Sequence, residues 1–113
     1  MKEVSNYIHG KLTCNSNKFQ NIIDPSKGEE IGKVVLSNEK DFLLAIESSK
    51  KSQVEWSNTT PLKRSRILAK YKNLIEDNME TLASIICKEH GKTFQDAMGS
   101  ITRGLEVVEF AIG

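Results

Sequence analysis

The apolar positions of this chain follow two different patterns, which meet near residue 37. Before that point, short apolar runs alternate with turn residues, and this spacing predicts strand segments over residues 7–12, 19–23 and 31–36. A tight turn is expected at His9-Gly10, because glycine tolerates positive φ. Proline and glycine occupy turn positions in the run 24–28, which predicts a hairpin between the second and third segments.

After residue 37, apolar residues recur every three or four positions, which predicts three amphipathic helices. Ser37 is a suitable N-cap for the first, with Phe42 and Ile46 on its apolar face. Thr60 is the expected cap of the second, because Pro61 fits the first helical position, where a missing N–H costs nothing.

The second predicted helix runs without a break to Gly91, which is expected to end it as a C-terminal cap. Thr93 and Asp96 form a start resembling a capping box for the third helix. Gly99 and Gly104 lie inside this third helix, where close packing against another helix is the simplest explanation for them.

These elements predict an α+β fragment, with strands and hairpins over residues 1–36 and three helices over residues 37–113. The helices carry more apolar surface than they can bury among themselves, so each is expected to need a partner surface. With 113 residues, the chain is one domain or part of a larger one.

Charge and composition exclude several classes of partner. Sixteen basic and 15 acidic residues are spread evenly, so there is no basic stripe for nucleic acid and no polybasic patch for a lipid surface. No apolar run is long enough to span a membrane, and the N-terminus lacks the apolar core of a signal peptide. We therefore expect a cytoplasmic protein in which Cys14 and Cys87 are free thiols.

Catalytic or metal-binding chemistry from cysteine and histidine is weakly indicated. Cys87 and His90 are three positions apart on one helix and could approach each other, but the sequence offers no acid to orient the histidine. A metal site combining them with His9 and Cys14 would lack any recognised ligand spacing.

Charged residues near the end of the chain have both structural and functional interpretations. Glu89 and Lys92 flank Gly91, and solvated charge at a helix end would explain both. Arg103 lies away from the apolar stripe of the third helix. An ion pair with Glu106 or Glu109 is its default interpretation, and the alternative is the binding of a carboxylate by its planar guanidinium group.

Several motifs in a fixed order resemble the N-terminal segment of the aldehyde dehydrogenase family. They are Ile8-His9-Gly10-Lys11, Asp24-Pro25-Ser26-Lys27-Gly28-Glu29, Trp56 followed by Arg64-Ser65-Arg66-Ile67-Leu68, Leu74-Ile75, and Glu89-His90-Gly91-Lys92-Thr93. The stretch from Arg103 to Ala111 is similar to the CoA-acylating methylmalonate-semialdehyde dehydrogenases. The chain departs from the family pattern at Asp24, where Asn is usual, and at Ser100, where an acid is usual.

The resemblance implies a parent α/β fold with a Rossmann-type NAD domain, a catalytic domain and an oligomerisation hairpin. It places the three helices of residues 37–113 in the cofactor-binding domain. Such enzymes use a cysteine thiol to attack the semialdehyde, pass a hydride to NAD and release an acyl-CoA with loss of carbon dioxide. The resemblance assigns Arg103 to the substrate carboxylate, and it assigns Glu89 and the backbone at Ile23 to a monovalent cation.

The family's catalytic cysteine and its NAD-binding segment have no counterpart in these 113 residues. We therefore expect no cofactor to bind this chain alone, and a truncated or partial enzyme of a homo-oligomeric parent that is inactive by itself. Two alternatives remain: a non-catalytic helical module that binds a partner, such as the rest of the dehydrogenase, or the product of a degraded gene.

Overall fold

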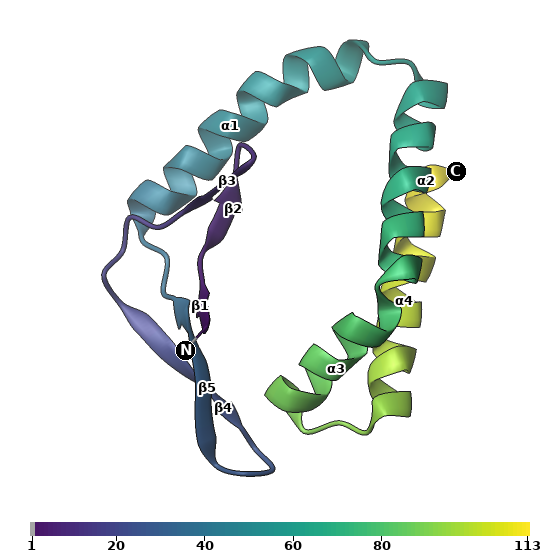
Figure 1. Cartoon of the computed structure of the whole chain (residues 1–113). Helices are drawn as coiled ribbons and strands as arrows, with labels where there is room; N and C mark the ends of the chain where they lie inside the picture. Colours follow the sequence, from purple (N-terminus) through teal and green to yellow (C-terminus); the bar gives the residue numbers. More distant parts are fainter. Residues whose placement is uncertain (1) are drawn as a thin grey trace. The chain divides into compact units, whose positions relative to one another are not determined.

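The computed structural model describes residues 2–113, which form two compact units, residues up to 58 and residues 59–113 (Figure 1). The first unit holds five strands and one helix, and the second holds three helices. The predicted α+β class is therefore confirmed. None of the helices in residues 2–113 combines the length and the apolar character needed to cross a bilayer.

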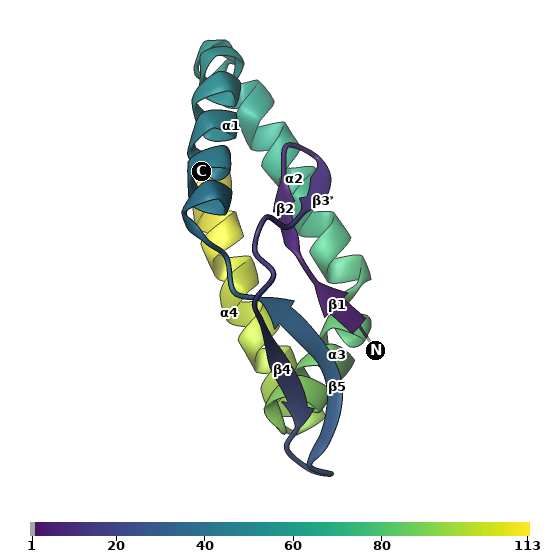
Figure 2. The same cartoon turned by 90° about the vertical axis from the view of Figure 1, so that its left-hand side faces the viewer.

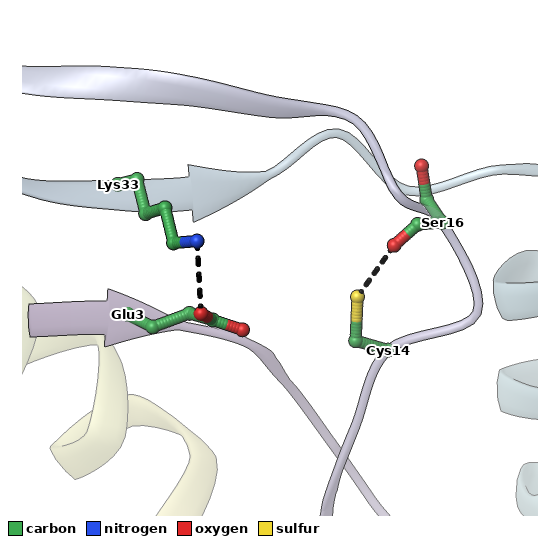
Figure 3. Close-up of polar contacts among 4 residues, drawn as sticks. All are labelled: Glu3, Cys14, Ser16 and Lys33. Atoms are coloured by element: carbon green, nitrogen blue, oxygen red, sulfur yellow. Dashed lines mark hydrogen bonds and ion pairs between the residues drawn. The ribbon is translucent and has the colours of Figure 1, made fainter.

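The larger sheet of the first unit has the strand order β1-β5-β4. β4 (Phe19–Asp24) and β5 (Glu29–Val35) form the predicted antiparallel hairpin, which Figure 2 shows in its twisted form. β1 (Lys2–Val4) pairs with β5 in parallel, and an ion pair of 3.2 Å between Glu3 and Lys33 links the two strands (Figure 3). The sequence did not predict β1, because a three-residue polar strand has no periodicity to detect.

The smaller sheet forms around the predicted tight turn at His9-Gly10, which divides the predicted segment 7–12 into two short strands. β2 (Asn6–Ile8) pairs antiparallel with β3 (Lys11–Thr13), and both turn residues have positive φ, 54° and 73°. At the other predicted turn, the amide of Gly28 donates to the carbonyl of Asp24 over 2.8 Å. The Asp24 carboxylate accepts hydrogen bonds from the Ser26 hydroxyl and amide, which lower its pKa.

Gly32 is required where β1 pairs with β5, opposite Lys2. A Cβ atom built on Gly32 would lie 2.7 Å from the carbonyl oxygen of Lys2. We expect Gly32→Ala to destabilise the pairing by about 1–3 kcal/mol, because packed backbone cannot give way to an extra methyl group. Amide hydrogen exchange at Val4 and Val34, which pair in this ladder, should become about tenfold faster.

Gly104→Ala is the matched control, because a Cβ at Gly104 or at Gly99 would meet no atom within 4 Å. Alanine inside an exposed helix should stabilise it by up to about 1 kcal/mol. Equal loss of protection in both variants would show that Gly32 is not a site of close approach. Within residues 2–113 no helix packs closely on Gly99 or Gly104, so the expectation that they serve close helix packing stays a prediction.

The first helix, α1 (Glu39–Asn58), is capped by Asn38 and not by the predicted Ser37. The Asn38 side chain accepts from the Asp41 amide over 3.1 Å, and the Asp41 carboxylate accepts from the Asn38 amide over 3.0 Å. This reciprocal pattern is a capping box with an acid at its third helical position. Ser37 instead exchanges hydrogen bonds with the side chain of Asn6.

Asp41 also fixes the loop that precedes β4. Its carboxylate accepts from the amide and the side chain of Asn15 at 2.9 and 3.1 Å. These hydrogen bonds, led by the one from the Asn38 backbone, hold the pKa of Asp41 below its usual value although the residue is only 2% exposed. One buried carboxylate thus joins the start of α1 to the strand region.

The second unit contains α2 (Pro61–Asp77), α3 (Met79–His90) and α4 (Phe94–Ile112). The predicted single helix over residues 61–90 is therefore wrong, and residues 2–113 hold four helices instead of three. It breaks at Asn78, whose side chain donates to the Leu74 carbonyl over 2.7 Å and whose backbone leaves the helical region. A short amide side chain that competes for backbone carbonyls explains the break.

The predicted helix caps at the other ends are confirmed. The side chains of Thr60 and Thr93 each accept a hydrogen bond from the amide three residues later. Gly91 ends α3 in the left-handed conformation with φ of 75°. These caps set the short connection between α3 and α4.

The core of the second unit lies where α4 packs against α2 and α3. Its buried members are Ala83, Ala97, Ile101 and Leu105. At the surface, Lys72 of α2 forms ion pairs with Glu76 at 3.4 Å and with Glu109 of α4 at 3.1 Å. Glu109 is the main reason that the pKa of Lys72 is raised. The pairing ties α2 to α4 beside the core.

Large apolar side chains remain exposed on the helices. Phe110 is 89% exposed, Val107 69% and Phe42 62%. Because each such side chain left in water forgoes about 1.5–3 kcal/mol, against a typical total stability of roughly 5–15 kcal/mol, we expect the isolated chain to associate and to bind a hydrophobic dye. Sedimentation velocity is the measurement, and a monomer with a cooperative melt and no dye binding would contradict the expectation.

Candidate functional site

Arg103 lies on the exposed face of α4, between the buried residues Ile101 and Leu105. This placement follows from helix geometry, because a residue two positions from a buried one points about 200° away from it. Its guanidinium Nη2 donates a hydrogen bond to the hydroxyl oxygen of Ser100 over 3.3 Å. The side chain is thus anchored one turn back along its own helix.

The default pairing of Arg103 with Glu106 or Glu109 is not formed within residues 2–113. Glu109 pairs with Lys72, and the ion pairs in this part of the chain include neither Arg103 nor Glu106. The contact of Arg103 is with a neutral oxygen. The guanidinium charge is therefore not neutralised by a carboxylate in the described part of the chain.

A second cation meets the same hydroxyl. Lys92, which is half-buried in the connection between α3 and α4, donates from Nζ to Ser100 Oγ over 2.9 Å. The Ser100 hydroxyl in turn donates to the backbone carbonyl of Asp96 over 3.2 Å. We call Lys92 and Arg103 the cationic pair. Together with Ser100 they form a small site on α4 that can attract an anion.

The sequence predicted that Arg103 lies off the apolar face of the helix but did not predict the contact of Lys92 with Ser100. Lys92 and Ser100 are eight residues apart, and their contact depends on how the chain turns between α3 and α4. The capping residues Gly91 and Thr93 could have revealed it, because two caps this close together define a tight connection.

Neither cysteine has the surroundings of a catalytic nucleophile. The thiol of Cys14 donates a hydrogen bond to the Ser16 carbonyl over 2.9 Å, as Figure 3 shows. Cys87 packs against the apolar cluster of α3 and α4. No hydrogen bond joins Cys87 to His90 in the part of the chain that the structure describes. Both thiols are free, as predicted.

The two residues assigned to a monovalent cation belong to different units. Glu89 is exposed near the end of α3. Ile23 lies in β4 beside an irregularity of the β4–β5 ladder. This assignment stays a prediction. Within residues 2–113, no three or more histidine, cysteine and acidic side chains lie close enough together to hold a metal ion. The combination of His9, Cys14, Cys87 and His90 is therefore not a metal site in this part of the chain.

A shallow hollow in the first unit is the competing candidate. It is lined by His9, Leu44, Glu47, Ser48 and Lys51 and has a volume of about 170 Å³. Its two charged residues, Glu47 and Lys51, neutralise each other in an ion pair of 3.1 Å. The hollow therefore offers less to a charged ligand than the site on α4.

Residues 12–113 match the family model of the aldehyde dehydrogenase family. The malonate-semialdehyde dehydrogenase of Pseudomonas aeruginosa is 36% identical over 111 residues, which are 98% of this chain and 22% of that protein. The malonate-semialdehyde dehydrogenase 2 of Bacillus cereus is 41% identical over 97% of this chain and 23% of its own length.

Solved structures match the fold along the whole chain. A candidate methylmalonate-semialdehyde dehydrogenase from Sinorhizobium meliloti 1021, in complex with NAD, superposes with a TM-score of 0.96 at 44% identity. The methylmalonate-semialdehyde dehydrogenase of Oceanimonas doudoroffii gives 0.94 at 35% identity. Each match covers 100% of this chain but 23% of the other. The chain thus spans somewhat less than a quarter of the length of its relatives.

Proposed function

The chain belongs to the aldehyde dehydrogenase family, and we propose that it forms the N-terminal part of a CoA-acylating, NAD-dependent dehydrogenase of malonate or methylmalonate semialdehyde. In the complete reaction, semialdehyde, CoA and NAD yield acyl-CoA, carbon dioxide and NADH. The names of the relatives support this substrate class.

Within these 113 residues, the proposed contribution is to hold the substrate by its carboxylate. The observation that carries it is the exposed guanidinium of Arg103. Within residues 2–113 its side chain forms a hydrogen bond to the neutral Ser100 hydroxyl and no ion pair with a carboxylate. A planar guanidinium can grip a carboxylate with two parallel hydrogen bonds. The aldehyde carbon at the other end of a three-carbon substrate would then be held at a set distance from Arg103.

NAD and coenzyme A would be held by segments outside these residues, where NAD accepts the hydride and coenzyme A takes the acyl group. The described chain has no glycine-rich phosphate loop, and its cysteines occupy the settings given above. Glu89 and the backbone at Ile23 are proposed to bind a monovalent cation in the assembled enzyme. A cytoplasmic homo-oligomer is the proposed setting of the complete protein.

A chimera tests this proposal. The 113 residues would replace the corresponding segment of the Pseudomonas relative, with which they share 36% identity. We expect the purified chimera to form NADH from malonate semialdehyde only when coenzyme A is present, with an acyl-CoA as product. A chimera that oxidises propanal but gives no reaction with malonate semialdehyde would overturn the assignment of substrate.

The second candidate function is a non-catalytic module that binds a partner. Exposed apolar side chains on α1 and α4, such as Phe42 and Phe110, favour it. Co-expression with the Pseudomonas relative from which the corresponding segment has been removed distinguishes the two candidate functions. If the 113 residues are the N-terminal part of a dehydrogenase, they should restore NADH formation. If they are only a binding module, they should bind the shortened relative without restoring it. The coding sequence beyond residue 113 distinguishes both from a degraded gene.

A further inference from the structure

We propose that the outer face of α4 is covered, in the working enzyme, by the larger part of a dehydrogenase chain that these 113 residues do not span. The outer face is defined by Gly99, Arg103, Val107 and Phe110, which follow one another at helical spacing. The inference rests on the proposed function, because its occupant is the rest of the same kind of enzyme. It adds the surface on which the two parts meet.

The helix α4 has an apolar stripe on each of two opposite sides. One side packs against α2 and α3 (Figure 1), and its buried residues are Ala97, Ile101 and Leu105. Val107 and Phe110 lie about 240° and 180° around the helix from Ile101. A helix at the surface of a domain normally has a polar face opposite its apolar stripe. Apolar residues on both sides indicate a helix that is enclosed between two layers.

The outer face lies in solvent within residues 2–113. Phe110 is 89% exposed and Val107 69%. Gly99 lies on the same face, and a Cβ built there would meet no atom within 4 Å. Glycine destabilises a helix interior relative to alanine. A surface that packs closely on Gly99 would give the missing side chain a purpose, which nothing in the described part of the chain does.

The solved relatives indicate what covers this face. They match the whole of this chain, which makes up 23% of each of them. The segment therefore already has the conformation that it has beside the remaining part of those enzymes. Its exposed apolar side chains are then available to that remaining part, and an apolar patch of this kind marks an interaction surface. We expect the occupant to be an apolar surface of the remaining dehydrogenase chain, and not a second copy of these residues.

Covering the outer face changes what Arg103 can do. On an open surface, an ion pair between a guanidinium and a carboxylate is weak, because water and salt screen it. Arg103 lies on the outer face between Gly99 and Val107. Once the face is covered, its charge lies in a less polar setting, where a carboxylate is attracted more strongly. The proposed carboxylate site is thus completed only when the two parts of the enzyme are joined.

Cysteine labelling tests the inference without a measurement of activity. Phe110→Cys and the matched control Leu12→Cys would be made in the 113-residue chain and in the chimera. Leu12 is a suitable control, because it is apolar and 76% exposed but lies in β3 of the first unit. Labelling by N-ethylmaleimide would be followed by peptide mass spectrometry. Phe110→Cys should react about tenfold more slowly in the chimera than in the dilute isolated chain, whereas Leu12→Cys should react similarly in both.

Three labelling results would overturn the inference. Unchanged labelling of Phe110→Cys in the chimera would mean that the outer face stays open. Equal protection of Phe110→Cys and Leu12→Cys would mean that the protection is not specific to this face. Protection in the isolated chain that rises with its concentration to the level of the chimera would assign the face to a second copy. A chimera that protects Phe110→Cys but does not oxidise malonate semialdehyde would support the inference and remove the proposed substrate.

Co-expression keeps the inference testable if the chimera does not fold. The 113-residue chain, produced with the shortened Pseudomonas relative, should be recovered on an affinity tag carried by that relative. Phe110→Asp should lower the recovered amount about tenfold, because a charge is costly to bury in an apolar contact. Leu12→Asp should leave the amount within about twofold of the unaltered chain, because it lies off the outer face. Equal recovery of the two variants, or no recovery of the unaltered chain, would overturn the inference.

Discussion

The isolated 113-residue chain is expected to form no NADH when it is mixed with malonate semialdehyde, NAD and coenzyme A. Oxidation through a thioester needs a thiolate poised beside a bound nicotinamide. The Cys14 thiol instead donates a hydrogen bond to a backbone carbonyl, and Cys87 packs in an apolar cluster. Neither is hydrogen-bonded to a base within residues 2–113.

Absorbance at the NADH band is the measurement, with two controls. The chimera should be active in the same assay, and the variant Cys14→Ser, Cys87→Ser of the isolated chain should give the same baseline as the unaltered chain. NADH formation that depends on the semialdehyde and disappears in the double-serine variant would mean that these cysteines are catalytic. That result would overturn the assignment of the chain to a non-catalytic part of the enzyme.

Features of the fold that depend on neighbouring residues were predictable from the sequence. The turn at Gly28 and the helix caps at Thr60, Gly91 and Thr93 all follow from side-chain chemistry within a few residues. Each cap satisfies backbone groups that the helix leaves open, so a suitable residue at a helix end is a strong signal.

The two wrong predictions of helix ends both involve asparagine. Asn38, and not Ser37, caps α1, because Asp41 stands three positions after Asn38 and completes the reciprocal pair. Asn78 ends α2, although the apolar spacing continues through it. Since α2 and α3 both pack against α4, one unbroken apolar pattern serves two helices. The apolar periodicity reflects the packing of both helices against α4 and does not reveal the break at Asn78.

Contacts between distant residues were beyond the reach of sequence patterns. β1 pairs with β5 across about 30 positions of sequence, through a close approach at Gly32 that only the structure reveals. Lys92 meets Arg103 through Ser100 because the connection after α3 turns back toward α4. The exposed placement of Arg103 on α4 could be predicted, because a helix face is a local property, but its link to Lys92 through Ser100 could not.

Arg103→Leu in the chimera is expected to lower kcat/KM for malonate or methylmalonate semialdehyde by about one to two orders of magnitude. A guanidinium facing a carboxylate forms charge-assisted hydrogen bonds worth roughly 1.5–3 kcal/mol, and each 1.4 kcal/mol corresponds to a factor of about ten in rate. Leucine keeps much of the side-chain volume but removes the charge. Steady-state rates at several substrate concentrations give the comparison.

Propanal is the matched substrate, because it has no carboxylate and should be nearly indifferent to the change. Arg103→Lys should rescue the semialdehyde reaction only in part, since a point charge cannot reproduce two parallel hydrogen bonds. The KM for NAD should stay the same in every variant. If Arg103→Leu reduced turnover of both aldehydes equally, Arg103 would act by supporting α4 through its hydrogen bond to Ser100, and carboxylate recognition would have to lie elsewhere in the enzyme.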